Sequence, residues 1–138
     1  MTRLLLVDDH AVVRSGLKML LSGHEEMEIV GEAGSAAEAM REAERTTPEV
    51  ILMDIGLPDK TGIEATRDIK KRFPEMKIVA LTIHEDEEYF FQMLDAGASG
   101  YVPKRAAPDE FITAIRAAAA RAVYLYPSMA SLLVHDYL

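Results

Sequence analysis

The sequence contains no cysteine and no tryptophan among its 138 residues. The lack of cysteine excludes disulfides, thiolate zinc sites and cysteine nucleophiles, and it suits a reducing compartment. No apolar run approaches the roughly 20 residues of a membrane-spanning helix, and the N-terminus lacks the basic and then apolar layout of a signal peptide. We therefore expect a cytoplasmic protein with no membrane partner.

Positive charge is also scarce, because 15 Lys and Arg residues stand against 23 Asp and Glu residues, for a formal net charge of −8. Nucleic-acid affinity depends largely on Lys and Arg side chains that neutralise phosphates. This chain by itself should therefore bind DNA poorly, whereas its carboxylates suit a divalent cation. Its length and its apolar fraction of 49% fit one ordinary globular domain.

Segments typical of strands alternate with segments typical of helices. Short apolar runs predict strands over 3–7, 27–33, 49–54, 76–82 and 99–102, and helical spacing predicts helices over 10–23, 35–46, 63–73, 85–97 and 108–122. Ser35 and Glu38 have the spacing of a capping box. Five such units predict an α/β fold, with a doubly wound parallel sheet covered by helices on both faces.

Polar side chains stand where these apolar strands end. Asp8 and Asp9 end the first strand, Asp54 the third and Thr82 the fourth, and Lys104 lies just past the fifth. In open parallel sheets, ligands bind outside the carboxyl ends of the strands. Close carboxylates repel unless a cation lies among them, and Mg²⁺ favours carboxylate and phosphate oxygens. The pattern predicts a Mg²⁺ site that receives a phosphoryl group.

An aspartate can itself accept a phosphoryl group, and the transfer requires mainly alignment and neutralisation of charge. Mg²⁺ would cover one phosphoryl oxygen, Lys104 a second, and the Thr82 hydroxyl with nearby backbone N–H groups the third. Taken alone, the paired aspartates would suit a helix N-cap, Thr82 a strand end and Lys104 a solvated loop. Their joint placement favours the phosphoryl site.

Four segments carry a resemblance to a known family: "LLLVDDH", "VILMDIGLPDKTGIE", "IVALTIHED" and "AGASGYVPK". In this order they resemble the receiver domain of two-component response regulators, over about 3–122, which implies a receiver domain at 1–122. The finer pattern, with "AVYLYPSMASLL" after the last helix, is similar to the NarL/FixJ (LuxR-type) subfamily. The resemblance implies a flavodoxin-like (βα)5 sheet with strand order 2-1-3-4-5. Residues 123–138 would begin a linker, with helical spacing, toward a helix-turn-helix domain that does not follow in this chain.

The resemblance also assigns roles. It implies that Asp54 is the phospho-acceptor, that Asp8, Asp9, Asp54 and the backbone carbonyl of Gly56 hold Mg²⁺, that Thr82 and Lys104 contact the phosphoryl group, and that Tyr101 is the switch aromatic. The partner would be a sensor histidine kinase, and phosphorylation would favour a homodimer. DNA would be bound only through the missing C-terminal domain. The chain would act as a signalling switch that catalyses only its own phosphorylation and slow dephosphorylation.

Other classes remain as alternatives. A receiver-like interaction module that never takes phosphate, or a stand-alone receiver, would share the fold. A haloacid-dehalogenase-type phosphatase needs a second aspartate two residues after the nucleophile, where this chain has Gly56. A flavin binder needs glycine and hydroxyls where the chain has "VDDHAVV". The four histidines lack the spacing of a zinc site, and His84 is expected only to border the phosphoryl site.

Overall fold

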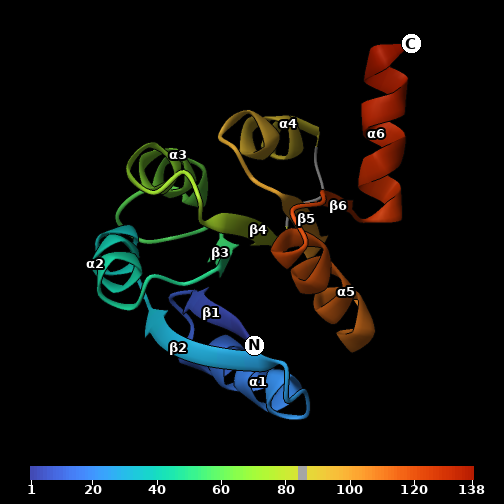
Figure 1. Ribbon diagram of the computed structural model, residues 1–138. Helices are drawn as coiled ribbons and strands as arrows, with labels where there is room; N and C mark the ends of the chain where they lie inside the picture. Colours follow the sequence, from blue (N-terminus) through green and yellow to red (C-terminus); the bar gives the residue numbers. More distant parts are fainter. Residues whose placement is uncertain (84–86) are drawn as a thin grey trace.

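The computed structural model describes residues 1–83 and 87–138. Six parallel strands form one sheet in the order β2-β1-β3-β4-β5-β6, with helices on both faces (Figure 1). The predicted doubly wound sheet is confirmed, and so is the predicted order of its first five strands. The sixth strand was not predicted and extends the sheet beyond β5. His84 and the start of the helix expected from residue 85 lie outside the described residues.

The elements follow the predicted alternation closely. The strands are β1 (Thr2–Val7), β2 (Met27–Ala33), β3 (Val50–Asp54), β4 (Lys77–Thr82), β5 (Gly100–Pro103) and β6 (Tyr124–Leu125). The helices are α1 (Ala11–Ser22), α2 (Ala36–Thr46), α3 (Gly62–Arg72), α4 (Glu87–Asp95), α5 (Pro108–Ala119) and α6 (Pro127–Tyr137). Among the helices that the structure describes, none combines the length and the apolar character that crossing a lipid bilayer requires.

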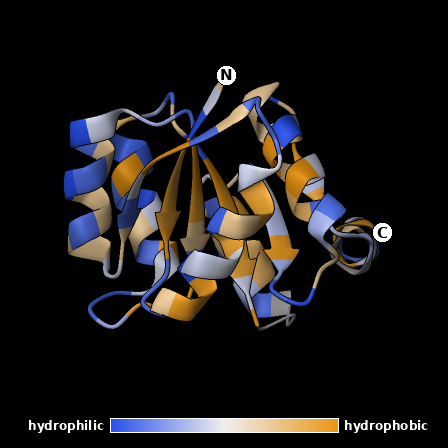
Figure 2. Ribbon diagram, turned by 90° about the horizontal axis from the view of Figure 1, so that it is seen from below, coloured by the Kyte–Doolittle hydropathy of each residue, from blue (hydrophilic) through white to orange (hydrophobic). Residues whose placement is uncertain are grey.

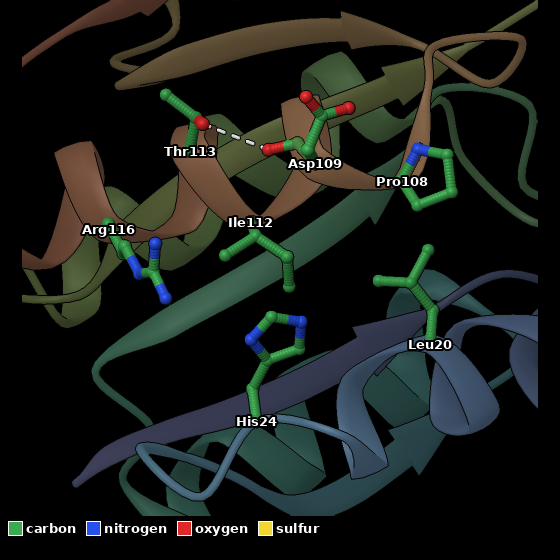
Figure 3. Close-up of a pocket in the computed structure, with 7 residues that line it drawn as sticks. All are labelled: Leu20, His24, Pro108, Asp109, Ile112, Thr113 and Arg116. Carbon is green, nitrogen blue, oxygen red and sulfur yellow. Dashed lines mark hydrogen bonds between the residues drawn. The ribbon is translucent and has the colours of Figure 1, made fainter.

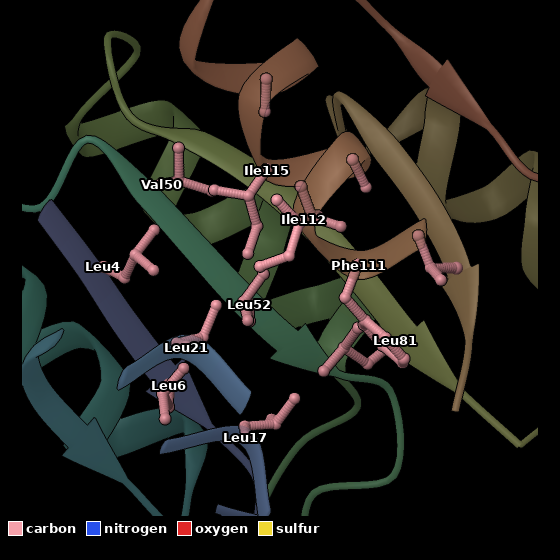
Figure 4. Close-up of a cluster of buried hydrophobic side chains, with 14 of the residues drawn as sticks. Leu4, Leu6, Leu17, Leu21, Val50, Leu52, Leu81, Phe111, Ile112 and Ile115 are labelled. Carbon is pink, nitrogen blue, oxygen red and sulfur yellow. The ribbon is translucent and has the colours of Figure 1, made fainter. Parts of the chain in front are cut away.

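The central strands are apolar throughout because both faces of the sheet are covered. Alternate side chains point to opposite faces, so Leu4 and Leu52 join the cluster under α1 and α5 (Figure 4). Leu5 and Ile51 join the cluster under α2 and α3 on the other face. Figure 2 shows the hydrophobic strands enclosed by helices with hydrophilic outer faces. The two layers hold the strand ends, and the polar residues on them, in fixed positions.

Local capping sets several helix ends. The Ser35 hydroxyl accepts a hydrogen bond from the backbone N–H of Glu38 (3.1 Å), as predicted for the start of α2. The Glu38 carboxylate, however, accepts from the N–H of Gly34 and not from that of Ser35, so only half of the capping box forms. A complete capping box joins Thr61 and Glu64 at the start of α3.

Helix α5 ends at Ala119, three residues before the predicted end at residue 122. Arg121 adopts the left-handed conformation (φ 62°), and the N–H of Ala122 donates to the carbonyl of Ala117 at 2.8 Å. The chain then turns so that the N–H of Tyr124 donates to Ser99 (3.0 Å) and β6 pairs with β5. Pairing with the sheet edge therefore outweighs the high helix propensity of the alanines at this end.

Helix α6 runs beside α4 at the edge of the molecule (Figure 1). Leu132 of α6 packs against the cluster that contains Phe90, Tyr101 and Met93, together with Leu125 and Tyr126. The Arg105 guanidinium lies 5.5 Å from the centre of the Tyr126 ring. The segment after α5 is therefore attached to the α4 side of the domain, and its role as a linker stays a prediction.

Candidate functional site

The carboxylates of Asp8 and Asp54 lie side by side at the carboxyl ends of β1 and β3. Strand pairing aligns Val7 with Met53, so the next residue of each chain segment, Asp8 and Asp54, emerges at the same edge. Both are almost completely buried, with 1% and 4% of their surface exposed. Two buried carboxylates this close require a cation or a proton between them.

Lys104 supplies positive charge to both. Its Nζ lies 2.7 Å from Oδ2 of Asp8 and 3.2 Å from Oδ1 of Asp54. The backbone N–H of Lys104 donates to the carbonyl of Thr82 (2.8 Å), which fixes the residue at the end of β4 although Pro103 precedes it. The described peptide bonds are all trans. The structure thus joins residues that lie 96 positions apart in the sequence.

Burial raises the pKa of the Asp54 carboxyl above its ordinary value, and repulsion from Asp8 adds to the rise. The charge of Lys104, its hydrogen bond and the N–H of Gly56, 3.3 Å from Oδ1, oppose this rise without cancelling it. Desolvation lowers the pKa of Lys104, but its bonds to Asp8 and Asp54 outweigh desolvation, and the net shift is upward. Lys104 therefore stays charged beside a carboxyl that is unusually basic.

Four residues form an acidic cluster that is suited to a metal ion. Asp8, Asp9, His10 and Asp54 each offer one ligand atom, and these atoms lie within 4.8 Å of one another. Three carboxylates facing one ammonium leave excess negative charge, and carboxylate oxygens are the donors that Mg²⁺ prefers. The donor set fits the predicted Mg²⁺. Gly56 lies two residues past Asp54. Its backbone N–H donates to Oδ1 of Asp54, so this hydrogen bond holds the loop next to the carboxylate.

The loop between β3 and α3 is held tightly against the site. The N–H of Gly62 donates to the carbonyl of Ile55 (2.7 Å), and a Cβ at Gly62 would lie only 2.1 Å from the carbonyl oxygen of Asp54. The Asp59 carboxylate accepts from the N–H groups of Ala36 (2.8 Å) and Ala37 (3.0 Å), and these bonds lower its pKa. Asp59 thereby attaches the loop to the N-terminus of α2.

Thr82 lies on β4, the strand next to β3, and Tyr101 lies on β5, the strand after it in the sheet. Thr82 is the last residue of β4, is 1% exposed and pairs with Pro103 of β5. Tyr101 is completely buried, and the Phe90 ring meets its ring edge to face at 5.4 Å between centres. The aromatic ring is therefore in an inward position, packed under α4.

A separate groove of about 490 Å³ runs between α1 and α5 (Figure 3). Leu20 and His24 line it from the α1 side and face Ile112 and Arg116 of α5. None of its lining residues belongs to the acidic cluster. The groove is thus a surface feature of the face opposite α2 and α3.

Sequence reasoning missed three residues near the site. His10 was considered only as a member of a zinc site, which the spacing of the histidines did not favour, yet its ring lies in the acidic cluster, and its direct neighbour Asp9 was the available signal. Arg14 donates from Nη1 to the backbone carbonyl of Asp8, and its Nε donates to Glu32. Asp59 was given no role, because its bond to α2 spans 23 residues and leaves no local pattern.

The family model "Response regulator receiver domain" matches residues 4–116, most of the chain. The chain belongs to the response-regulator receiver family. Its fold, its sheet order and its position-by-position motifs agree with that membership. The predicted membership is confirmed, and the relatives below place the receiver in the NarL/LuxR group of regulators.

The curated relatives are transcriptional and signalling regulators. The receiver is 37% identical to the transcriptional regulatory protein DegU of Brevibacillus brevis over 98% of this chain and 57% of that protein. It is 38% identical to the oxygen regulatory protein NreC of Staphylococcus carnosus, over 98% of this chain and 63% of that protein. The chain therefore spans about three fifths of the length of these relatives.

Solved structures agree with the fold over nearly the whole chain. A two-component response regulator of the LuxR family from an Aurantimonas species superposes with a TM-score of 0.94 at 36% identity, covering 99% of this chain and 98% of that one. The isolated receiver of RcsB from Salmonella enterica serovar Typhimurium, solved with the phosphomimetic BeF3−, gives 0.87 at 26% identity over 95% of this chain and 97% of that one. The β6 and α6 segment lies within the first superposition.

Proposed function

We propose that Asp54 accepts a phosphoryl group from a sensor histidine kinase and that the phosphorylated receiver is the active state of a transcriptional switch. The observation that carries this proposal is the single ammonium of Lys104, bonded at once to Asp8 (2.7 Å) and to Asp54 (3.2 Å). Such an arrangement neutralises part of the negative charge of the buried carboxylates before transfer. After transfer it leaves a cation beside the phosphoryl oxygens.

In the transfer step, a carboxylate oxygen of Asp54 attacks the phosphorus of a phosphohistidine. The O–P bond forms as the N–P bond breaks, and the electron pair of that bond stays on the imidazole nitrogen of the kinase. The raised pKa makes the Asp54 carboxylate a better nucleophile than an exposed aspartate, since burial removes the water that would stabilise its charge. Lys104 then moves from neutralising the carboxylate to neutralising a phosphoryl oxygen.

Asp8, Asp9, Asp54 and the backbone carbonyl of Gly56 would hold Mg²⁺ in this site. When bound, the ion supplies the second positive charge that the phosphoryl oxygens need and aligns them for transfer. The acidic cluster supports this assignment, because it offers several hard oxygen donors within the span of one ion. The carboxylates of Asp8 and Asp54 are buried and bonded to Lys104. The surrounding protein therefore holds them in position before any ion binds.

The switch would depend on Thr82 and Tyr101. We assign the Thr82 hydroxyl to a phosphoryl oxygen, because it ends the strand next to Asp54, where the two segments are joined by the N–H of Ile55 and the carbonyl of Leu81. A bond to Thr82 that forms only with the phosphoryl group favours one of two pre-existing loop positions. Tyr101, already inward, would be held there by that loop position.

The output would be a homodimer that controls transcription through a C-terminal DNA-binding domain. Residues 123–138 would begin the linker to that domain. Two faces of a receiver are available for dimerisation: the one around α4 and β5, and the one made by α1 and α5. We favour the second, because α6 lies beside α4 in this chain while the groove between α1 and α5 is open.

Mass spectrometry after incubation with acetyl phosphate tests the proposal. We expect the wild type to gain one phosphoryl group when Mg²⁺ is present and very little in its absence. Asp54→Asn should gain none. Asp68→Asn, which changes an exposed aspartate bonded to Lys60, is the matched control and should behave as wild type.

If Asp54→Asn gains the same mass as the wild type, another residue is the acceptor and the assignment is wrong. If the wild type gains no phosphoryl group and binds no beryllofluoride, the chain is an interaction module that works without phosphorylation. A Mg²⁺-independent gain at Asp54 would leave the acceptor in place and remove the metal from the mechanism.

A further inference from the structure

The acidic cluster contains a nitrogen donor that the proposed Mg²⁺ site does not use. We propose that the His10 imidazole is a further ligand of this cation site and that the site therefore binds divalent transition metals through nitrogen as well as oxygen. The inference rests on the proposed function only in placing a cation among Asp8, Asp9 and Asp54.

The distances around His10 suit coordination. Its Nδ1 lies 3.0 Å from Oδ1 of Asp9 and 3.1 Å from Oδ1 of Asp8. Around an ion whose ligands lie at about 2.1 Å, two ligands at right angles are about 3.0 Å apart, whereas tetrahedral neighbours are about 3.4 Å apart. The separation of Nδ1 from each carboxylate oxygen therefore matches that of adjacent ligands in an octahedral shell.

The described interactions of the ring are all with the acidic cluster, where Nδ1 lies within hydrogen-bonding distance of Oδ1 of Asp8 (3.1 Å), and a cation between these atoms would replace that hydrogen bond. His10 is the N-cap residue of α1, but its side chain makes no capping hydrogen bond. Its backbone N–H donates to Oδ1 of Asp8 (2.8 Å), which fixes the main chain next to the cluster. The side chain is 65% exposed, yet Nδ1 faces both carboxylates. The ring direction is thus set by the acidic cluster.

Lys104 and His10 contact different oxygens of Asp8 and otherwise different members of the cluster. The ammonium bonds to Asp8 and Asp54, while the ring contacts Asp8 and Asp9. An ion bound between the ring and Asp9 would therefore complete the charge balance on the more exposed side of the site. A neutral imidazole suits Co²⁺, Ni²⁺, Zn²⁺ and Fe²⁺, whereas carboxylate and water suit Mg²⁺. His10 would consequently change metal selectivity more than it changes Mg²⁺ affinity.

Titration calorimetry with CoCl2 and with MgCl2, on wild type and on His10→Asn, tests this inference. Asparagine is favoured at helix N-caps, so α1 should form normally, and far-UV circular dichroism checks it. We expect the variant to bind Co²⁺ at least about tenfold more weakly and to bind Mg²⁺ within about twofold of wild type. His24→Asn removes a partly exposed histidine that lies 3.8 Å from Glu26, outside the cluster, and should change neither affinity.

A second variant and a second readout separate coordination from a structural role. His10→Asp replaces nitrogen by a hard oxygen donor, so it should lose Co²⁺ affinity and gain Mg²⁺ affinity. Proton NMR of the Co²⁺-loaded wild type should show strongly shifted imidazole signals that are absent in His10→Asn. Equal Co²⁺ binding by wild type and His10→Asn, or an equal loss of both metals, would overturn the inference.

Failure of the proposed function has a different signature. If the wild type binds no Mg²⁺, the proposed Mg²⁺ site is wrong whatever Co²⁺ does. If Mg²⁺ binds and the Co²⁺ affinity does not depend on His10, the Mg²⁺ site stands and only the role of the histidine is removed.

Discussion

Asp54 shows how burial can prepare a side chain for chemistry while it opposes folding. Burial first, and the charge of Asp8 second, raise its pKa in the folded protein. Between the unfolded and the folded pKa, the folded state binds more protons than the unfolded state, so stability falls as the pH rises through that range. Above the folded pKa, the ionised carboxylate therefore carries a constant cost to stability.

We expect Asp54→Asn to raise the free energy of unfolding near neutral pH in the absence of divalent cations. The gain should shrink as the pH falls through the folded pKa and vanish below the ordinary aspartate value of 3.8, because the wild-type carboxyl is then protonated in both states. Urea denaturation at several pH values measures this. Asp68→Asn should show no such gain, and a gain for Asp54→Asn that is independent of pH would contradict the explanation.

Among the elements, the connection from β3 to α3 positions the site most directly. Its backbone folds back so closely that Gly62 passes the carbonyl oxygen of Asp54, with no room for a side chain. The open space around Gly16, on the surface of α1, is the opposite case, because a Cβ there meets no atom within 4 Å. Gly62 is therefore required because no side chain fits at that position, whereas no steric constraint requires a glycine at position 16.

Gly62→Ala should lower the free energy of unfolding by about 1 to 3 kcal/mol, because the new methyl group forces the backbone at Asp54 to move. Phosphorylation by acetyl phosphate should slow as well, since the acceptor carboxylate would be displaced. Gly16→Ala, the control, should raise stability by about 0.5 to 1 kcal/mol through helix propensity. Chemical denaturation compares the two, and equal effects of both changes would show that the close approach is not tight.

Substitutions in helix α6 test whether the segment after α5 stabilises the domain. Leu132 packs on the cluster around Phe90 and Tyr101, while its neighbour Leu133 is 40% exposed. Leu132→Ala should lower the free energy of unfolding by about 1 kcal/mol, a fraction of the cost at a fully buried leucine. Leu133→Ala should change it by less than about 0.5 kcal/mol. Thermal unfolding of both variants gives the comparison, and an unaffected Leu132→Ala would mean that α6 does not stay on α4 in solution.

For the whole molecule, the net charge of −8 opposes the proposed dimer. A phosphoryl group of about −1.5 to −2 would replace the single charge of the Asp54 carboxylate, so phosphorylation adds at most about −1 to this repulsion. Salt screens such repulsion over about 10 Å at 0.1 M ionic strength. Association through the groove between α1 and α5 should therefore strengthen with salt, contrary to what salt does to attractive ion pairs.

Analytical ultracentrifugation with beryllofluoride and Mg²⁺ should show a dimer whose dissociation constant falls severalfold as salt rises from about 0.05 to 0.5 M. Thr113→Arg places a bulky side chain at the edge of the groove and should weaken the dimer by about tenfold or more. Ser131→Arg, an equivalent change on the exposed surface of α6, should have little effect. If Ser131→Arg breaks the dimer and Thr113→Arg does not, the face around α4 is the interface.

The sequence alone predicted the alternation of elements, because apolar runs and helical spacing are local consequences of burial on one or both faces. It also predicted that Asp8, Asp54 and Lys104 would converge, since parallel strands deliver their carboxyl ends to one edge. The contacts among Lys104, Asp8 and Asp54 confirm that convergence, whereas their roles in phosphoryl transfer stay predictions.

Only the tertiary structure decided the rest. The early end of α5 and the strand β6 depend on pairing with Gly100 and Tyr101, a contact between distant segments that outweighs the helix propensity of the alanines. The direction of the His10 ring and the bond of Asp59 to α2 likewise depend on which groups lie nearby in space. Periodicity fixes which face of an element is buried, but the partner that a polar side chain meets is set by packing.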